Sequence, residues 1–137
     1  MSNLHPPESE DIDALLAWAV KFVDEHRLRL FACACCRRIW HLMSDERSRK
    51  SVEVAEMHAN GELGIEALRQ SNIAVRDAWV QNSAQADDHA AAAAFYCSIP
   101  KPAMLPADAN RVQAVVTDKE LERKQQIALL RSIVNRV

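Results

Sequence analysis

The sequence predicts an all-α fold, a single-domain helical bundle of five or six helices with a central hydrophobic helix that contains cysteines. Only two of the 137 residues are glycine, so few positions suit the tight turns of β-hairpins. Alanine, the residue that favours helices most, is abundant. Apolar residues recur at i, i+3 and i+4 along most of the chain, which is the pattern of helices with one buried face.

The bundle is expected to begin after a short lead-in. Residues 1–8 contain two consecutive prolines and predict an extended segment, which leaves residues 9–137 for the helical bundle domain. The first helix is expected from Ser9 or Asp11. Acidic residues there suit the positive end of a helix dipole, and the apolar residues that follow repeat at helical spacing.

Polar residues divide the next part of the chain into two further helices. Asp24 is placed to cap a second helix that runs to about Met43. The residues Ser44-Asp45-Glu46 resemble an N-cap with an acidic first turn and predict the start of a third helix. That helix is expected to end at Asn60-Gly61, a typical C-cap signal.

The remaining helices are separated by prolines. A fourth helical region of about 30 residues begins near Ile65, with Asn82-Ser83 as the place for a break. Three prolines make residues 99–109 a loop. Residues 111–116 fit either a short helix or a strand. A capping box from Thr117 to Glu120 then predicts a final amphipathic helix.

The second predicted helix carries three of the four cysteines. On a helical wheel of residues 28–43, Cys35 and Cys36 fall on a broad apolar face, and Cys33 falls at its edge. Free cysteine at a core position behaves as a small hydrophobic residue. The wide apolar arc indicates a central helix that is contacted from several sides.

A metal or thiol site is the alternative interpretation of this segment. Cys33 and Cys36 form a C-x-x-C pair, and His41 and Cys97 are the further residues that could complete a zinc or redox site. However, zinc sites normally place such a pair in a turn and add a second pair downstream. A redox pair lies at a helix N-terminus, where the dipole lowers the thiol pKa. We therefore expect core packing and no cofactor.

Several other functions are disfavoured by composition and by missing motifs. The formal net charge of −2 gives no general attraction to nucleic acid. Phosphate-binding glycine loops, H-E-x-x-H, G-x-S-x-G and the E-x-x-H pairs of di-iron bundles are all missing. The acidic N-terminal segment lacks the apolar stretch of a secretion signal, and no apolar run approaches the roughly 20 residues of a membrane span. A cytoplasmic protein with reduced thiols and no membrane association is expected.

One region is nevertheless rich in basic residues. They surround the junction of the second and third predicted helices, with a tryptophan among them, and are the candidates for binding a partner: Arg37, Arg38, Trp40, Arg47, Arg49 and Lys50. Acidic residues interleave with them, so i,i+4 pairing within the chain is the simplest expectation. Binding of phosphates, of a nucleic-acid backbone or of an acidic partner is the alternative.

The run RLRLFACACCRRIWHLMSDERSRKSVEVAE, residues 27–56, resembles the opening motif of a family of uncharacterised planctomycete proteins. In that family a similar segment precedes an alanine-rich helical region and a closing helix of the type QxxLLRxI, which residues 87–95 and 126–133 match here. An NPFRP-like segment that follows in many members is missing after Asn135. The resemblance implies a helical domain and no particular activity, so it transfers no functional residue.

The function predicted from the sequence is a non-catalytic protein-interaction or adaptor module, as a subunit or regulator within a larger system. The expected partner is another protein, and a homo-oligomer is compatible with the sequence. One competing function is a small zinc or redox protein built on Cys33, Cys36 and Cys97. The other is an accessory nucleic-acid-binding protein using the basic residues Arg47, Arg49 and Lys50.

Overall fold

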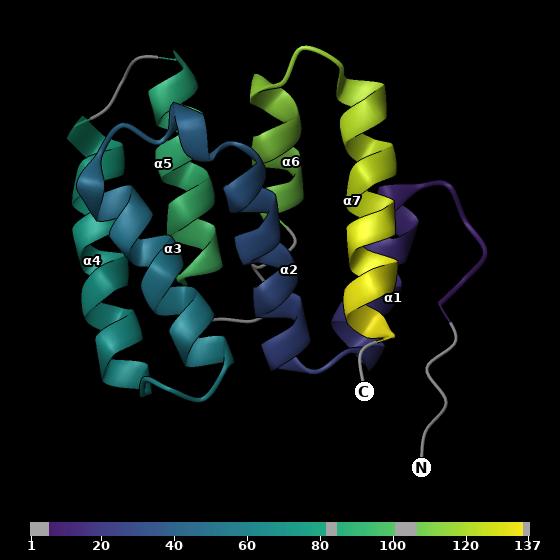
Figure 1. The fold of residues 1–137 in the computed structure, drawn as a ribbon, viewed down its shortest axis with the longest axis horizontal. Coiled ribbons are helices and arrows are strands. Elements are labelled where there is room, and N and C mark those ends of the chain that lie inside the picture. The colour runs from purple at the N-terminus through teal and green to yellow at the C-terminus, as the bar shows by residue number, and fades with distance from the viewer. Residues whose placement is uncertain (1–5, 82–84, 101–106, 136–137) are drawn as a thin grey trace.

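The computed structural model describes residues 6–81, 85–100 and 107–135. Over these residues all regular secondary structure is helical, with seven α-helices, one 3-10 turn and no strand (Figure 1). The elements are α1 (Ile12–Phe22), α2 (Glu25–Arg38), η1 (Trp40–Leu42), α3 (Glu46–Ala59), α4 (Ile65–Gln81), α5 (Gln85–Cys97), α6 (Ala107–Val115) and α7 (Lys119–Val134).

The all-α prediction is therefore confirmed, whereas the predicted number of five or six helices is too low. The fourth helical region forms two helices, α4 and α5, on either side of the expected break at residues 82–83, which themselves lie outside the described residues. The ambiguous residues 111–116 lie mostly in α6, so the helix was the correct choice. Of the predicted lead-in, only residues 6–8 are described, and they are not helical.

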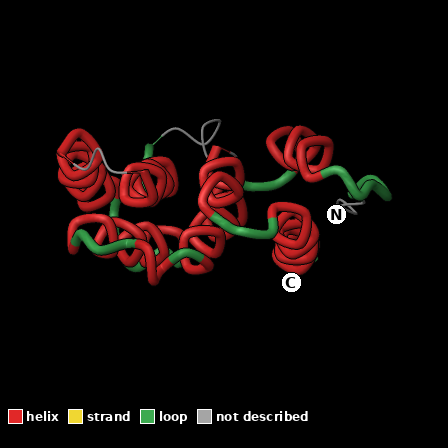
Figure 2. The backbone as a smooth tube through the Cα atoms, turned by 90° about the horizontal axis from the view of Figure 1, so that it is seen from above, coloured by secondary structure: helices red, strands yellow, loops and turns green. Residues whose placement is uncertain are grey.

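The helices pack in two layers. One layer contains α4, α5 and α6, the other contains α3, α2 and α7, and α1 packs on α7 at one end of the molecule (Figures 1 and 2). The cysteine-bearing helix α2 contacts α3, α5, α6 and α7, so it occupies the central position that its apolar circumference predicts. None of the described helices is long and apolar enough to cross a membrane.

Aspartate side chains begin four of the helices. Asp11, Asp24, Asp45 and Asp118 each accept a hydrogen bond from a backbone N–H in the first turn of α1, α2, α3 and α7 respectively. The cap predicted at Asp24 is confirmed. The capping box predicted from Thr117 is wrong, because the capping side chain is that of the next residue: Asp118 accepts the N–H of Leu121 at 3.0 Å.

The second helix ends five residues earlier than predicted. α2 stops at Arg38, and the chain continues through the 3-10 turn η1 to Met43. Arg49 of α3 explains this change, because its Nε donates to Met43 O at 2.7 Å and its Nη2 donates to Trp40 O at 3.1 Å. A guanidinium from another helix thus satisfies carbonyl groups that leave the α-helical ladder.

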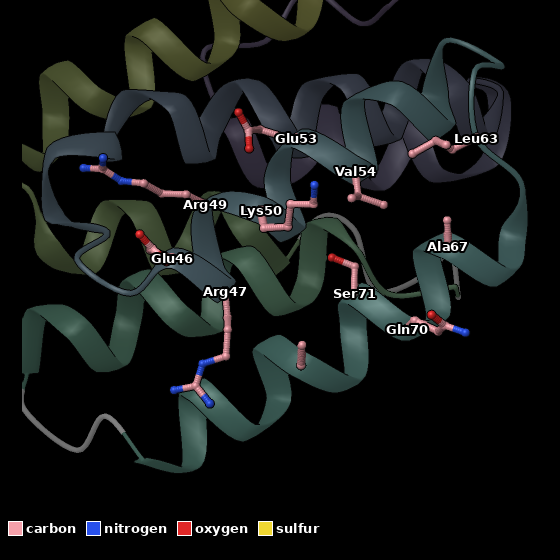
Figure 3. Close-up of a pocket in the computed structure, with 11 residues that line it drawn as sticks. Glu46, Arg47, Arg49, Lys50, Glu53, Val54, Leu63, Ala67, Gln70 and Ser71 are labelled. Atoms are coloured by element: carbon pink, nitrogen blue, oxygen red, sulfur yellow. The ribbon is translucent and has the colours of Figure 1, made fainter.

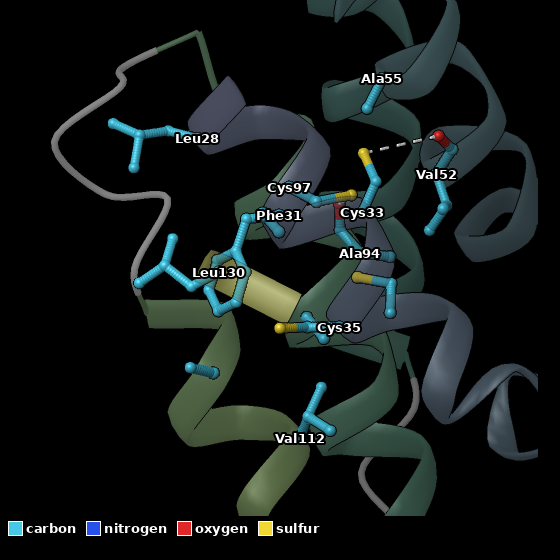
Figure 4. Close-up of a cluster of buried hydrophobic side chains, with 14 of the residues drawn as sticks. Leu28, Phe31, Cys33, Cys35, Val52, Ala55, Ala94, Cys97, Val112 and Leu130 are labelled. Atoms are coloured by element: carbon cyan, nitrogen blue, oxygen red, sulfur yellow. Dashed lines mark hydrogen bonds between the residues drawn. The ribbon is translucent and has the colours of Figure 1, made fainter. Parts of the chain in front are cut away.

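The core is built from small and sulfur-containing side chains as well as larger apolar ones. All four cysteines are buried, and the consecutive alanines 90–94 of α5 have at most 1% of their surface exposed (Figure 4). Cys33, predicted at the edge of the apolar face, is only 1% exposed because α3 covers it. Its Sγ lies 4.0 Å from Val52 O. Small side chains let neighbouring helices approach α2 and α5 closely.

One arginine is also part of this interior. Arg29 of α2 is completely buried, and its Nη1 donates to Cys97 O and to Ile99 O, both at 2.9 Å. Its Nη2 donates to Glu25 Oε1 at 2.8 Å. The guanidinium therefore caps the C-terminal end of α5, where unpaired carbonyls concentrate the negative end of the helix dipole.

Candidate binding groove

A groove lies between α3 and α4 (Figure 3). These two helices lie at the end of the molecule opposite α1 (Figure 1). We call this groove the α3–α4 groove. It has a volume of about 900 Å³ and is lined by Glu46, Arg47, Arg49, Lys50, Glu53, Val54, Leu63, Ala67, Gln70, Ser71 and Ala74. Three of the residues predicted as partner-binding candidates, Arg47, Arg49 and Lys50, are among them.

The wall formed by α3 is charged at its rim. Glu46, Lys50 and Glu53 are exposed and follow one another at i, i+4 and i+7, so they share one face of the helix. None of the three side chains makes a hydrogen bond or ion pair with another described residue, although Glu53 acts electrostatically on Arg37. Val54 lies deeper in the groove and is buried. This wall therefore combines available charges with apolar surface.

The wall formed by α4 is small and uncharged. Ala67, Ser71 and Ala74 repeat at i, i+4 and i+7, and Gln70 lies beside them. Ser71 Oγ is covered by protein atoms and has no hydrogen-bond partner, which is true of no other buried side-chain nitrogen or oxygen in the described part of the chain. In Figure 3 this hydroxyl points from α4 towards α3, on the side where Lys50 lies.

The turn between the two helices fixes one end of the groove. Gly61 adopts a φ of +81°, which favours glycine, directly after α3 ends. The N–H of Glu62 returns to Met57 O at 2.8 Å. His58 Nδ1 lies 2.9 Å from Leu63 O, and because a carbonyl only accepts, this nitrogen carries the proton. The C-cap predicted at Asn60-Gly61 is thereby confirmed.

Two of the three predicted arginine and lysine candidates in the groove are held by the protein itself. Arg47 forms a bidentate ion pair with Asp45, with Nη2–Oδ2 at 2.7 Å, and also donates to Gln81 Oε1 at 2.7 Å. The hydrogen bonds to Asp45 raise the pKa of Arg47. Arg49 is occupied by the carbonyls of Trp40 and Met43. Lys50 is the cation that remains available.

The other predicted partner-binding residues lie away from this groove. Arg37 and Arg38 line a smaller cleft of about 360 Å³ between α2, α3 and α7, together with Leu30, Cys33, Ala34, Glu56, Leu129 and Ile133. Arg37 binds both carboxylate oxygens of Glu56, at 2.9 and 2.7 Å, and this contact raises the pKa of Arg37. Arg38 binds both oxygens of the buried Glu122. The expected i,i+4 pairing is therefore wrong for these two arginines, because their carboxylate partners lie on α3 and α7.

Trp40 connects the two groups of arginines. The guanidinium carbon of Arg37 lies 4.1 Å from the centre of the Trp40 ring, and that of Arg49 lies 5.1 Å from it. Two cations therefore use the ring as a stacking surface. The half-buried Trp40 packs against the core and contributes to the junction of α2 and α3.

The cysteines do not come together with other ligands in the described residues. No group of three or more His, Cys, Asp and Glu side chains there is arranged to hold a metal ion. His41 is exposed on η1, whereas Cys33, Cys36 and Cys97 are buried. Cys97 Sγ lies 3.3 Å from Ala94 O in its own helix.

Sequence reasoning missed two structural features near these sites. The role of Arg29 is not predicted from the sequence, although Glu25 four residues earlier is a signal for an ion pair. Ser71 carried no signal, because its importance depends on α4 facing α3. No protein-family model, curated protein or solved structure matches this chain.

Proposed function

We propose that this chain is a non-catalytic protein-interaction or adaptor module, a subunit or regulator of a larger system, and that it binds an α-helical segment of another protein in the α3–α4 groove. The observation that carries the proposal is the composition of the groove. Apolar side chains lie beside exposed charged side chains that form no hydrogen bond or ion pair with the described residues. Helix-binding grooves use this combination, in which apolar contacts give affinity and charges give specificity.

The wall of α4 favours a helix as the bound element. Its small side chains, Ala67, Ser71 and Ala74, form a shallow row along the groove. Two helices pack with their axes about 8–10 Å apart, and the smaller distances require small residues at the contact. Val54 and Leu63 supply the apolar surface on which the larger side chains of the bound helix would pack.

The proposal is tested by filling the groove. Ala74→Arg places a long charged side chain in it, whereas Ala128→Arg makes the same change at an exposed position of α7. A partner captured by the unchanged chain should be recovered in the same amount with Ala128→Arg. Its recovery should fall at least tenfold with Ala74→Arg, as measured by quantitative mass spectrometry of affinity-purified material. Equal recovery of every captured protein by the two variants would contradict binding in this groove.

The zinc or redox alternative is checked by measuring the metal content of the purified protein. Elemental analysis of protein purified without chelators should find no stoichiometric zinc if the cysteines serve only for packing. One zinc per chain that is lost in Cys33→Ser would favour the alternative.

The nucleic-acid alternative is checked by salt dependence. Binding to DNA or RNA that weakens steeply between low and physiological salt, and that is lost on replacing Lys50 by Gln, would favour it. The exposed Glu46 and Glu53 on either side of Lys50 argue against this outcome, since they repel phosphates.

A further inference from the structure

We infer that the α3–α4 groove recognises an acidic side chain of the bound helix, an inference that rests on the proposed function. The bound helix places a Glu or Asp carboxylate between the Lys50 ammonium and the Ser71 hydroxyl, and basic residues about one turn to either side of it face Glu46 and Glu53. The groove therefore recognises a helix with the charge order basic, acidic, basic along its edge.

Lys50 supplies the charge for this contact. It lies in the middle of the charged rim, is exposed, and forms no hydrogen bond or ion pair with the described residues around it. In contrast, the neighbouring guanidiniums of Arg47 and Arg49 are already bonded to Asp45 and to backbone carbonyls. An ammonium group has three donors, so Lys50 can bind a carboxylate while part of it stays hydrated.

Ser71 supplies the second donor. Its hydroxyl is covered by the protein and lacks a partner, although buried polar groups in proteins are nearly always hydrogen-bonded. It lies in the wall opposite Lys50 and points towards α3 (Figure 3). Ser71 Oγ has almost no accessible surface in the free chain, so a carboxylate reaches it when the bound helix moves the side chains that cover it. The carboxylate would then accept this O–H as well as an N–H of Lys50, so binding would satisfy a group that folding leaves unpaired.

The flanking carboxylates define the rest of the pattern. Glu46 precedes Lys50 by four residues and Glu53 follows it by three, so the three charges lie along about 10 Å of one helix face. The order acidic, basic, acidic is nearly symmetric. Its complement on a partner helix therefore fits in either direction along the groove. A continuous polyanion meets a repulsive carboxylate on either side of Lys50, whereas a helix with mixed charges matches all three residues.

The test is a selection of helical peptides on the full chain. The library presents an amphipathic helix of about 20 residues, long enough to be partly helical alone. Its apolar positions vary among apolar residues, and three edge positions vary among Lys, Gln and Glu. Enrichment of Glu at the central position and of Lys at the flanks is the expected result. The affinity of a selected peptide should fall at least tenfold with Lys50→Glu and about fivefold with Ser71→Ala.

Variants of the chain separate charge reading from other effects. Selection on Lys50→Glu should reverse the central preference from Glu to Lys, and selection on Lys50→Gln should remove it. Lys21→Glu makes the same charge change on α1, at the far end of the molecule, and should leave the preference unchanged. Circular dichroism and the thermal midpoint establish that each variant is folded. Should Lys50→Glu be unstable because it adjoins Glu46 and Glu53, Lys50→Gln alone decides.

The possible failures are distinguishable. Peptides that lose binding with Ala74→Arg but show no central acidic preference would overturn the inference and leave the proposed function standing. The absence of any selected peptide that depends on Ala74 would overturn both. Selected peptides whose preference for a central acidic residue is the same on the unchanged chain and on the Lys50 variants would also overturn the inference, because Lys50 would then not recognise that residue.

Discussion

At the scale of single residues, Arg29 shows how one charged side chain serves a mostly apolar interior. Its three hydrogen bonds join the start of α2, through Glu25, to the end of α5, through the carbonyls of Cys97 and Ile99. The charge is compensated by a carboxylate and by the negative end of a helix dipole. Removing the guanidinium would leave two carbonyls unpaired in a place that water reaches poorly.

Replacement of Arg29 should accordingly be costly. We expect Arg29→Met to lower the free energy of unfolding by about 3 kcal/mol, because it breaks charge-assisted hydrogen bonds at a buried site. Urea denaturation followed by circular dichroism measures this loss. Arg69→Met removes an exposed arginine that pairs with Glu66 at 3.7 Å and is the matched control, with an effect below about 1 kcal/mol. Equal effects of the two variants would show that the buried hydrogen bonds of Arg29 contribute no more to stability than an exposed ion pair.

At the scale of elements, the helix ends depend on both local and distant residues. The start of α2 at Asp24 is predictable, because an aspartate cap acts on N–H groups three residues away. The end of α2 is not, since the residue that takes the carbonyls of Trp40 and Met43 is Arg49 on the next helix. Similarly, the wheel of residues 28–43 places Cys35 and Cys36 inside, whereas the burial of Cys33 requires α3.

The candidate site divides in the same way. Arg47, Arg49 and Lys50 were identified as binding candidates from their proximity along the chain, and the structure places all three around one groove. Which of them is available was beyond the sequence, because it depends on contacts such as Arg47 with Gln81, which are 34 residues apart. Ser71, Ala67 and Ala74 enter the site only through the packing of α4 on α3.

The start of α7 gives a direct test at this scale. Asp118→Ala should lower the free energy of unfolding by about 1 kcal/mol, because its carboxylate accepts the N–H of Leu121 at 3.0 Å. Thr117→Ala, which removes the residue that a capping box would use, should change it by less than about 0.5 kcal/mol. Thermal or urea unfolding of both variants measures the difference. The reverse order of effects would place the cap at Thr117.

At the scale of the whole molecule, two helices in the middle hold the layers together. α2 lies in one layer and α5 in the other, each contacts most of the remaining helices, and all four cysteines lie on them. The buried faces of these two helices consist largely of alanine and cysteine side chains. Access to these side chains therefore requires neighbouring helices to separate, so it reports on opening of the fold and not on a local fluctuation.

Thiol labelling should follow this expectation. In the native protein none of the four cysteines should react at the rate of a free thiol, and all four should react in urea. A thiol-specific reagent with mass spectrometry counts the modified residues. Ala128→Cys adds an exposed thiol on α7 as a positive control that reacts at once. Rapid labelling of native Cys33, which borders the smaller cleft, would contradict this and would favour the thiol alternative.

The central position of α2 also has a consequence during synthesis of the chain. The hydrogen-bond partners of Arg29 and Arg38, at Ile99 and Glu122, follow them by 70 and 84 residues. The ribosome adds about 5–20 residues each second. The apolar face of α2 therefore stays uncovered for several seconds until α5, α6 and α7 have been made. During that interval a newly made helix rich in cysteine is exposed to oxidants and to other chains. A chaperone or a reducing environment would therefore protect this chain most before α7 has been made.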